Sequence, residues 1–303
     1  MKVLLTGANG FLGKIISIGL KNHDIVSLGL KRSDIECNIA IEQPLLPPGI
    51  DLVIHCAGKA HVIPKNKEEE EEFFKINYQG TVNLCNSLLK SEGQIKNFVL
   101  ISTVSVYGKD IGQHITEDTP LNGTTPYALS KIKAEKHVQS WAEKNGVNAL
   151  ILRLPLVVGL NPPGNLGKMI EAIAKRRFFL IGKGEARKSM VCADDLVPII
   201  LKNIDKTGIY NLTDSEHPSF ASIVTAIIEG GHYKRSLNIP LWFAKIIASI
   251  SEFLPSFPFN RDTLNKMILD LTFEDEKARS ELGWNPTPAL TKLKEIITIR
   301  ETL

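Results

Sequence analysis

The chain has 303 residues, of which 43% are hydrophobic and 23% are charged. This is an ordinary globular composition, with enough length for a sizeable buried core. The formal net charge is +3, and without a run of Lys or Arg this balance argues against a nucleic-acid partner. The four cysteines are scattered and form no Cys-x-x-Cys pair: Cys37, Cys56, Cys85 and Cys192. We therefore expect no metal site and no disulfide framework, but reduced thiols in a cytoplasmic protein.

A glycine-rich turn follows the first apolar segment. Residues 2–5 suit a buried parallel strand and residues 14–21 suit a helix, and between them the spacing is Gly-x-x-Gly-x-x-Gly. Glycines allow a tight turn and a close approach to phosphate, and a helix start offers free N–H groups. A glycine turn needed only for packing would have the same sequence. We predict a pyrophosphate site made by Gly7, Asn9, Gly10, Phe11, Leu12 and Gly13.

The end of the second expected strand, residues 25–30, bears on the choice of cofactor. In a dinucleotide-binding fold, an acid at this point binds the adenosine ribose hydroxyls and selects NAD. No acid closes this strand; Lys31 and Arg32 follow it instead, and two cations suit the 2′-phosphate of NADP(H). We therefore favour NADP(H) over NAD(H), while two solvated surface charges are the alternative interpretation.

Residues 51–58 form another apolar segment, which ends in Ala57 and Gly58. Small residues at the carboxyl end of a parallel strand leave room for a ligand in the crevice there, so we place both in the cofactor site. His55, inside the segment, is interpreted as a core residue and not as a catalytic one. Residues 68–89 are predicted to form a helix that has acids in its first turn and carries Asn77.

Two side chains with a chemical use, Tyr127 and Lys131, lie four residues apart. On a helix this spacing places both on one face, and Thr125 followed by Pro126 predicts that a helix starts here. A nearby ammonium lowers the pKa of a phenol from its usual value of roughly 10, so that it can exchange protons near neutral pH. Thr103, where the strand that starts at residue 97 turns polar, would complete a Thr/Tyr/Lys set. A Tyr and a Lys that merely share a helix face are the alternative.

The second half of the chain is expected to leave the sheet and then return to it. Residues 149–154 suit a parallel strand, the turn-rich residues 155–167 suit an exit to a second lobe, and residues 209–212 suit a last strand of the sheet. Asp194-Asp195 is expected to cap a returning helix. The apolar segment 237–259 is predicted to be a buried or lobe-packing helix without membrane contact.

Taken together, these segments resemble the extended short-chain dehydrogenase/reductases that act on nucleotide sugars, the NAD-dependent epimerase/dehydratases. Enzymes of O-antigen and capsule synthesis are similar in two further features, a second strand that ends in basic residues and an Arg-Arg-Ser motif before an Asp. The matching segments run in order over nearly the whole chain: 6–13, 53–58, 77–81, 102–108, 126–131, 153–159, 187–196 and 282–286.

The resemblance implies an α/β fold, a Rossmann-type doubly wound parallel sheet with a smaller C-terminal substrate lobe. Residues 1–155 would form the dinucleotide-binding domain, to which residues 189–215 return. Residues 156–188 and 216–303 would form the substrate-binding lobe. The family also implies a homodimer and a nucleotide-sugar substrate, with no membrane partner.

The resemblance also implies roles for individual residues. Tyr127 would be the general acid/base, Lys131 would bind the nicotinamide ribose and lower the Tyr127 pKa, and Thr103 would hydrogen-bond the reacting sugar oxygen. Two further groups are implied by their positions in the family motifs. They are Asn77 and Leu154 at the cofactor, and Arg187 and Lys188 at the substrate diphosphate, where ordinary surface charge is the alternative.

Departures from the family pattern reduce the number of reactions that this chain is expected to catalyse. Thr103 is followed by Val104-Ser105, where 4,6-dehydratases have Asp-Glu, so elimination of water lacks its acid/base pair. Without the Cys of the fucose-synthase type, 3,5-epimerisation is also disfavoured. We therefore expect hydride transfer at C4 of a nucleotide-linked hexose, with UDP as the favoured nucleotide. Among enzymes of this type we favour a 4-keto-sugar reductase. A UDP-hexose 4-epimerase is the alternative, and a non-catalytic cofactor-binding regulatory protein is a more distant one.

Overall fold

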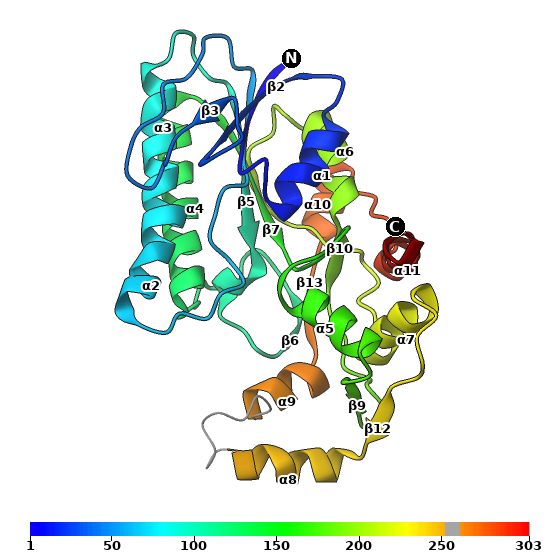
Figure 1. Cartoon of the computed structure of the whole chain (residues 1–303). Coiled ribbons are helices and arrows are strands. Elements are labelled where there is room, and N and C mark those ends of the chain that lie inside the picture. The colour runs from blue at the N-terminus through cyan, green and yellow to red at the C-terminus, as the bar shows by residue number, and fades with distance from the viewer. Residues whose placement is uncertain (252–260, 303) are drawn as a thin grey trace.

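The computed structural model describes residues 1–251 and 261–302, and its centre is a seven-stranded parallel sheet (Figure 1). The strand order is β11-β7-β5-β4-β1-β2-β3. The chain runs from β1 outward to β3 and then crosses back to β4, so the order reverses between β1 and β4, where such folds bind ligands. The strands are β1 (Lys2–Thr6), β2 (Asp24–Gly29), β3 (Ile35–Glu36), β4 (Leu52–His55), β5 (Asn97–Thr103), β7 (Asn148–Leu154) and β11 (Gly208–Asn211).

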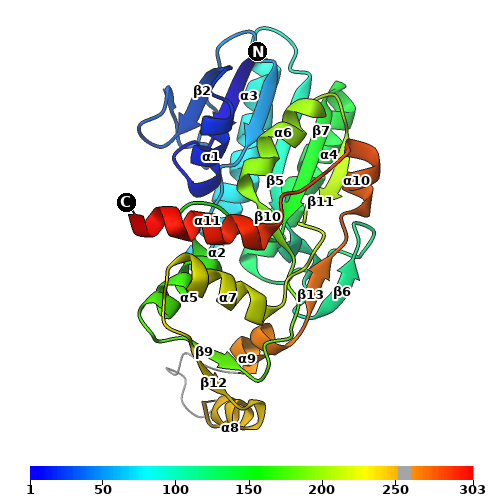
Figure 2. The same cartoon turned by 90° about the vertical axis from the view of Figure 1, so that its right-hand side faces the viewer.

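Helices cover both faces of this sheet, as the two views show (Figures 1 and 2). Because side chains alternate along a strand, Leu4 joins the core with α3 (Gly80–Lys90) and α4 (Pro126–Asn145), while Leu5 joins the core on the opposite face. That opposite face is covered by α1 (Phe11–Gly19), α6 (Leu196–Lys202) and α10 (Glu276–Leu282). The predicted doubly wound α/β fold is confirmed.

The helix predicted over residues 68–89 contains a change of helical pitch. It begins as α2 (Lys67–Phe73), continues as a π-helical segment, η1 (Phe74–Gln79), and ends as α3. Asn66 caps its start by accepting a hydrogen bond from the Glu69 amide at 2.9 Å. The π-helical segment, which the sequence pattern did not predict, carries Asn77.

The rest of the chain forms three small parallel strand pairs and a second helical layer. The pairs are β6 (Gly112–Ile115) with β13 (Leu271–Phe273), β8 (Leu156–Val158) with β10 (Met190–Cys192), and β9 (Phe179–Ile181) with β12 (Leu237–Ile239). Figure 2 shows α11 (Ala289–Thr302) beside α7 (Phe220–Gly230), and both share an apolar core with α5 (Gly164–Ala174). Short 3₁₀ segments are η2 (Val104–Tyr107) and η3 (Ala193–Asp195).

The expected division into a Rossmann domain and a lobe remains a proposal. Residues 156–188 and 216–251 supply the β9–β12 pair and the helices α5, α7 and α8, which lie below the sheet (Figure 1). However, Ala278, Leu282 and Trp284, which the division assigns to the lobe, pack into the core of the sheet.

Two local predictions need correction. Asp195 makes no side-chain cap on α6; its carboxylate instead accepts hydrogen bonds from the amide and hydroxyl of Thr287, both at 2.8 Å. Asp194 pairs with Lys292 at 2.7 Å. These acids therefore hold the start of α11 against α6, because carboxylates bind whichever donors the fold brings near.

The apolar segment 237–259 is also arranged differently from the prediction. Its described part forms β12 and then α8 (Leu241–Ser251), and residues 252–260 lie outside the described residues. In α8 the small residues Ala244 and Ala248 are buried, whereas Trp242 is 64% exposed. The large side chains of this helix face solvent, so a buried helix is wrong, whereas the other form of the prediction, a helix that packs on its neighbours, fits the contacts of Ala244 and Ala248. No helix in the described part of the chain has the length and apolar character needed to cross a bilayer.

Candidate active site

The glycine turn between β1 and α1 is closely packed. The Gly10 amide donates to the Gly7 carbonyl at 2.9 Å, and Gly7 has a φ of +71°, which favours glycine. A Cβ on Gly13 would lie 2.1 Å from the Gly7 carbonyl oxygen. No side chain caps α1 at Gly10, so the first N–H groups of the helix, starting at Phe11, suit a pyrophosphate.

Asn9 connects this turn to the loop after β2. Its side-chain amide donates to the carbonyl oxygens of Lys31 at 2.9 Å and Arg32 at 3.2 Å. Both basic side chains are exposed, within reach of the phosphate turn. Glu36 on β3, to which the sequence analysis gave no role, accepts a hydrogen bond from the Arg32 amide at 2.7 Å. The pair of cations thus sits on a loop whose shape Asn9 and Glu36 maintain.

Asn77 is 1% exposed and links the end of β4 to α4. Its side-chain oxygen accepts from the Lys59 amide at 2.7 Å, and its nitrogen donates to the Lys59 carbonyl at 3.0 Å and to the Ser130 hydroxyl at 2.9 Å. Ser130 in turn donates to the Tyr127 carbonyl at 2.7 Å. The side-chain amide of Asn77 therefore holds the loop at residues 58–59 against the start of α4. A Cβ on Gly58 would lie 3.0 Å from the Asn77 oxygen.

His55 is a buried structural residue, as predicted. Thr81 donates its proton to the Asn77 carbonyl at 2.7 Å, so it accepts at 2.9 Å from Nε2–H of His55, whose Nδ1 accepts from Thr6 at 2.6 Å. Burial, together with the charge of Lys131, lowers the His55 pKa to about 3. The ring is therefore neutral at physiological pH, and both of its nitrogens are engaged by buried hydroxyl groups.

The hydroxyl groups of Thr103, Ser105 and Tyr127 lie close together where β5 ends and α4 begins. Thr125 caps α4 by accepting from the Ala128 amide at 3.2 Å, as predicted, and Tyr127 stands in the first turn. Thr103 lies close enough to Tyr127 to lower its pKa, and it donates to the Ser105 hydroxyl at 3.2 Å. Ser105 is exposed and was not among the predicted site residues.

Leu154 ends the neighbouring strand, β7, and is the register partner of Thr103. It is buried, at 4% exposure. Its place beside the hydroxyl cluster fits the predicted contact with a cofactor, which remains a prediction.

Lys131 lies beneath this cluster, 6% exposed, and donates to the Ile101 carbonyl at 2.7 Å. Burial lowers its pKa to about 8, while the Glu135 carboxylate acts in the opposite direction. Burial raises the pKa of Tyr127, against the effect of the Thr103 hydroxyl. Lys131, whose ammonium is directed to a backbone carbonyl, is not among the groups that shift this pKa, so its effect on Tyr127 stays a prediction.

A buried ion pair joins α4 to the neighbouring strand β7. Arg153 of β7 donates to Glu135 of α4 at 2.7 Å, and the two side chains are 2% and 1% exposed. Ser102 also donates to Glu135, and Arg153 donates to the Tyr107 hydroxyl at 2.9 Å. The sequence analysis assigned no role to Glu135, although it follows Lys131 by four residues on the same helix face.

The two residues predicted to bind the substrate diphosphate have different surroundings. Arg187 is exposed, and its guanidinium donates to the His217 carbonyl at 3.3 Å. Lys188 is half-buried and donates to the Leu269 carbonyl at 2.7 Å. Asp270 accepts from the Arg187 amide at 2.7 Å, which places a carboxylate beside both cations. Contact with a diphosphate remains a prediction, and Arg187 is the better placed for it.

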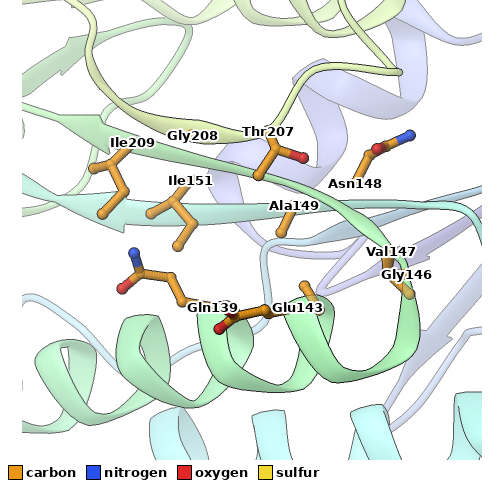
Figure 3. A pocket seen from close by; sticks show the side chains of 11 residues that line it. Gln139, Glu143, Gly146, Val147, Asn148, Ala149, Ile151, Thr207, Gly208 and Ile209 are labelled. Carbon is orange, nitrogen blue, oxygen red and sulfur yellow. The ribbon is translucent and has the colours of Figure 1, made fainter.

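A pocket of about 500 Å³ lies away from these residues, between the second half of α4 and the beginnings of β7 and β11. Figure 3 shows Gln139 and Glu143 on the helix side and Ile151 and Ile209 on the strand side. It opens at the amino ends of the strands, whereas folds of this type bind ligands at the carboxyl ends. We therefore do not assign the catalytic function to it. Among the described residues, no cluster of His, Cys, Asp and Glu could hold a metal ion.

Residues 3–213 match the model of the NAD dependent epimerase/dehydratase family. The chain belongs to this family. It is 25% identical to the UDP-glucose 4-epimerase of Vibrio cholerae over 95% of this chain and 92% of that protein. It is 26% identical to the N-acetyl-alpha-D-glucosaminyl-diphospho-ditrans,octacis-undecaprenol 4-epimerase of Escherichia coli O157:H7, over 78% of this chain and 75% of that protein.

Similarity of fold extends over the complete chain. The structure of the UDP-glucose 4-epimerase from Thermotoga maritima with UDP-glucose superimposes with a TM-score of 0.77 and 20% identity, and covers 100% of this chain and 99% of that one. Proteins with this fold have been solved with NAD and with NADPH. The protein is thus an enzyme of the nucleotide-sugar epimerase/dehydratase group, with NAD(P) as the family cofactor.

Proposed function

We propose that this enzyme transfers hydride at C4 of a nucleotide-linked hexose. The observation that carries the proposal is the placement of Thr103 and Tyr127 together at the carboxyl edge of the sheet, with the buried Lys131 ammonium beside them. The glycine turn after β1 fits a dinucleotide, because a Cβ on Gly13 would collide with the turn and α1 starts without a side-chain cap.

The three side chains have distinct tasks. NAD(P), when bound, supplies or accepts the hydride. Tyr127 gives a proton to the sugar oxygen during reduction or takes one during oxidation. Thr103 donates a hydrogen bond to that oxygen, and the positive charge of Lys131 stabilises the negative charge that develops there.

The first candidate reaction is 4-epimerisation of a UDP-hexose. Oxidation at C4, rotation of the keto sugar and reduction from the opposite face use one set of residues and need no second acid/base pair. The similarity to UDP-glucose 4-epimerases over nearly the whole chain supports this reaction better than the reductase that the sequence analysis favoured.

The second candidate is a 4-keto-sugar reductase, and one observation favours it. The exposed Lys31 and Arg32 follow β2, where they suit the 2′-phosphate of NADPH, the cofactor that a reductase uses stoichiometrically. We accordingly propose NADP(H) over NAD(H), with Lys31 and Arg32 as the residues that discriminate between them.

The carrier of the sugar is proposed to be a nucleoside diphosphate. The relative from E. coli is named for a sugar on a polyprenyl diphosphate, and the two carriers share the diphosphate. An assay of both carriers with the same hexose separates recognition of the base from recognition of the diphosphate alone.

A mass-resolved assay tests the proposal. Purified enzyme is incubated with UDP-hexoses and NAD(H), and in parallel with a UDP-4-keto-6-deoxy-hexose and NADPH. Interconversion of UDP-hexose stereoisomers without net cofactor change would establish the epimerase. Loss of NADPH with a gain of two hydrogens would establish the reductase, and the absence of both reactions would contradict transfer at C4.

Tyr127→Phe is the matched variant for this assay, because it removes only the hydroxyl. We expect a loss of about 10²–10⁴-fold in turnover, the usual contribution of a positioned acid/base, with nearly unchanged cofactor affinity. Retained turnover would refute the role of Tyr127. For the cofactor, dissociation constants of NADPH and NADH are compared in the wild type and in Lys31→Ala/Arg32→Ala, with Lys21→Ala as an exposed control. Equal affinities for the two cofactors in the wild type would remove the role given to this pair.

A further inference from the structure

In helix α8 the small apolar side chains are buried and the large ones are exposed. Its alanines, Ala244 and Ala248, pack into a small core with Ile181 and Leu264. Its large side chains point outward, with exposures of 64% for Trp242, 44% for Phe243, 48% for Ile246 and 56% for Ile250. The spacing of 242, 243, 246 and 250 places them on one helix face. A soluble surface rarely collects so many large apolar side chains without a binding role.

A second exposed apolar pair continues this surface. Leu237 of β12 and Phe179 of β9 are register partners, 69% and 43% exposed. Side chains two residues apart share a face of a strand, so this pair lies on the same face as Ile239 and Ile181, which pack with α8. We call the exposed side chains of α8 and this pair together the α8 surface.

The charged side chains within residues 231–251 have one sign. Residues 231–251 contain Lys234, Arg235 and Lys245 and no Asp or Glu, and all three cations are exposed. Helices that lie at the interface between a bilayer and water typically combine Trp and Phe with nearby Lys and Arg. The apolar side chains enter the acyl boundary, and the cations attract anionic headgroups.

The position of α8 fits a docking role. Both views place it, with β9 and β12, at the end of the molecule farthest from β2 and β3 (Figures 1 and 2). At that end it can approach a flat surface without obstruction from the central sheet. A two-fold dimer through this surface would bring the cations of both copies into one interface, where residues 231–251 supply no carboxylate to pair with them, and like-charge contacts are unfavourable.

We propose that the α8 surface docks the enzyme onto an anionic phospholipid membrane, parallel to the bilayer and without crossing it. This inference is independent of the reaction at C4. It revises the expectation of a protein with no membrane partner, which treated the segment as buried. The occupant is the headgroup region of an anionic bilayer, recognised by apolar insertion and by charge.

The chain contains its own reporter for this contact. Of its three tryptophans, Trp242 is exposed, whereas Trp141 and Trp284 are 6% and 4% exposed. The wild-type protein is mixed with vesicles of phosphatidylglycerol and phosphatidylcholine, or of phosphatidylcholine alone, at low and high salt. We expect cosedimentation and a blue shift of Trp emission with the anionic vesicles, both weakened by salt because screening shortens the reach of the cations.

Matched variants assign the contact to particular residues. Trp242→Ser/Ile246→Ser should weaken vesicle binding by at least about tenfold, the factor expected from losing one large buried side chain. The control Ile18→Ser/Leu45→Ser removes two apolar side chains that are 70% and 93% exposed elsewhere and should bind like the wild type. Circular dichroism and thermal melting check that each variant is folded.

Three results would overturn the proposal. One is the absence of both sedimentation and an emission shift with anionic vesicles at low salt. Another is binding that the α8 double variant leaves unchanged. The third is a dimer in light scattering that the double variant abolishes while the wild type ignores vesicles, which would make the surface an interface between copies. The assay of sugar turnover is separate, so failure of membrane binding and failure of the proposed reaction are distinguishable.

Discussion

Glu135→Gln removes one charge from the buried ion pair beneath the catalytic helix and keeps the shape of the side chain. In the wild type, Arg153 donates to Glu135 from Nη2 at 2.7 Å and from Nε at 3.2 Å. In the variant, the guanidinium keeps the Tyr107 hydroxyl at 2.9 Å but loses its directly paired carboxylate, and Glu117 interacts with it only at longer range. The variant therefore isolates the electrostatic contribution of one side chain.

The magnitude follows from burial. Both side chains are at most 2% exposed, and breaking such a pair by removing one partner costs about 3–5 kcal/mol, because a charge is left uncompensated. For a chain of 303 residues, each kcal/mol corresponds to about 1.6 °C, so Tm should fall by about 5–8 °C. The Lys131 pKa should also fall below its value of about 8, since Glu135 supports the charged form.

A double-mutant cycle with Arg153→Met provides the control. The double variant Glu135→Gln/Arg153→Met removes the unpaired guanidinium, and Ser102 can still donate to the Gln oxygen; Lys131 loses the Glu135 carboxylate in both variants, so this loss cancels in their comparison. Its free energy of unfolding, from urea titration, should recover most of the loss seen in Glu135→Gln. A loss below about 1 kcal/mol in the single variant, or simple additivity of the two single losses, would refute the argument from the buried pair.

Three further predictions concern other buried groups. Burial raises the Asp214 pKa to about 6, so the charged carboxylate destabilises the fold progressively above pH ~4 and fully above pH ~6. Asp214→Asn should therefore stabilise the protein by up to roughly 3 kcal/mol at pH 7 and by little at pH 4. Urea unfolding at the two pH values measures this difference. The folded Lys131 has a pKa of about 8 against an ordinary 10.5, so the unfolded chain binds more protons between these values; wild-type stability should rise by roughly 2 kcal/mol relative to Lys131→Met between pH 7 and 10, and parallel pH profiles would contradict this. Gly13→Ala should abolish tight NAD(P)H binding, because its Cβ would lie 2.1 Å from the Gly7 carbonyl; an unchanged dissociation constant, with unchanged circular dichroism, would show that the turn does not hold the cofactor.

Local patterns were sufficient for individual elements, and the resemblance of these segments, in order, to a known family predicted the doubly wound sheet. Apolar segments indicated strands and the glycine turn indicated the helix after it, because each pattern reports on its own element. The spacing of Tyr127 and Lys131 likewise indicated one helix face, and the Thr125 cap is present as predicted. These features depend on residues within one or two turns of each other.

Tertiary structure decided which partners these residues meet. The pairing of Glu135 with Arg153 joins α4 to β7, and no local pattern specifies which buried cation will face a carboxylate. The pKa of Tyr127 moves upward because the fold buries the phenol, although the sequence places a cation one turn away. In α8 the apolar residues alone predicted burial, but the small alanines occupy the inner face and leave the large side chains outside. Periodicity shows which side chains share a face, and only packing against the rest of the chain determines which face is turned inward.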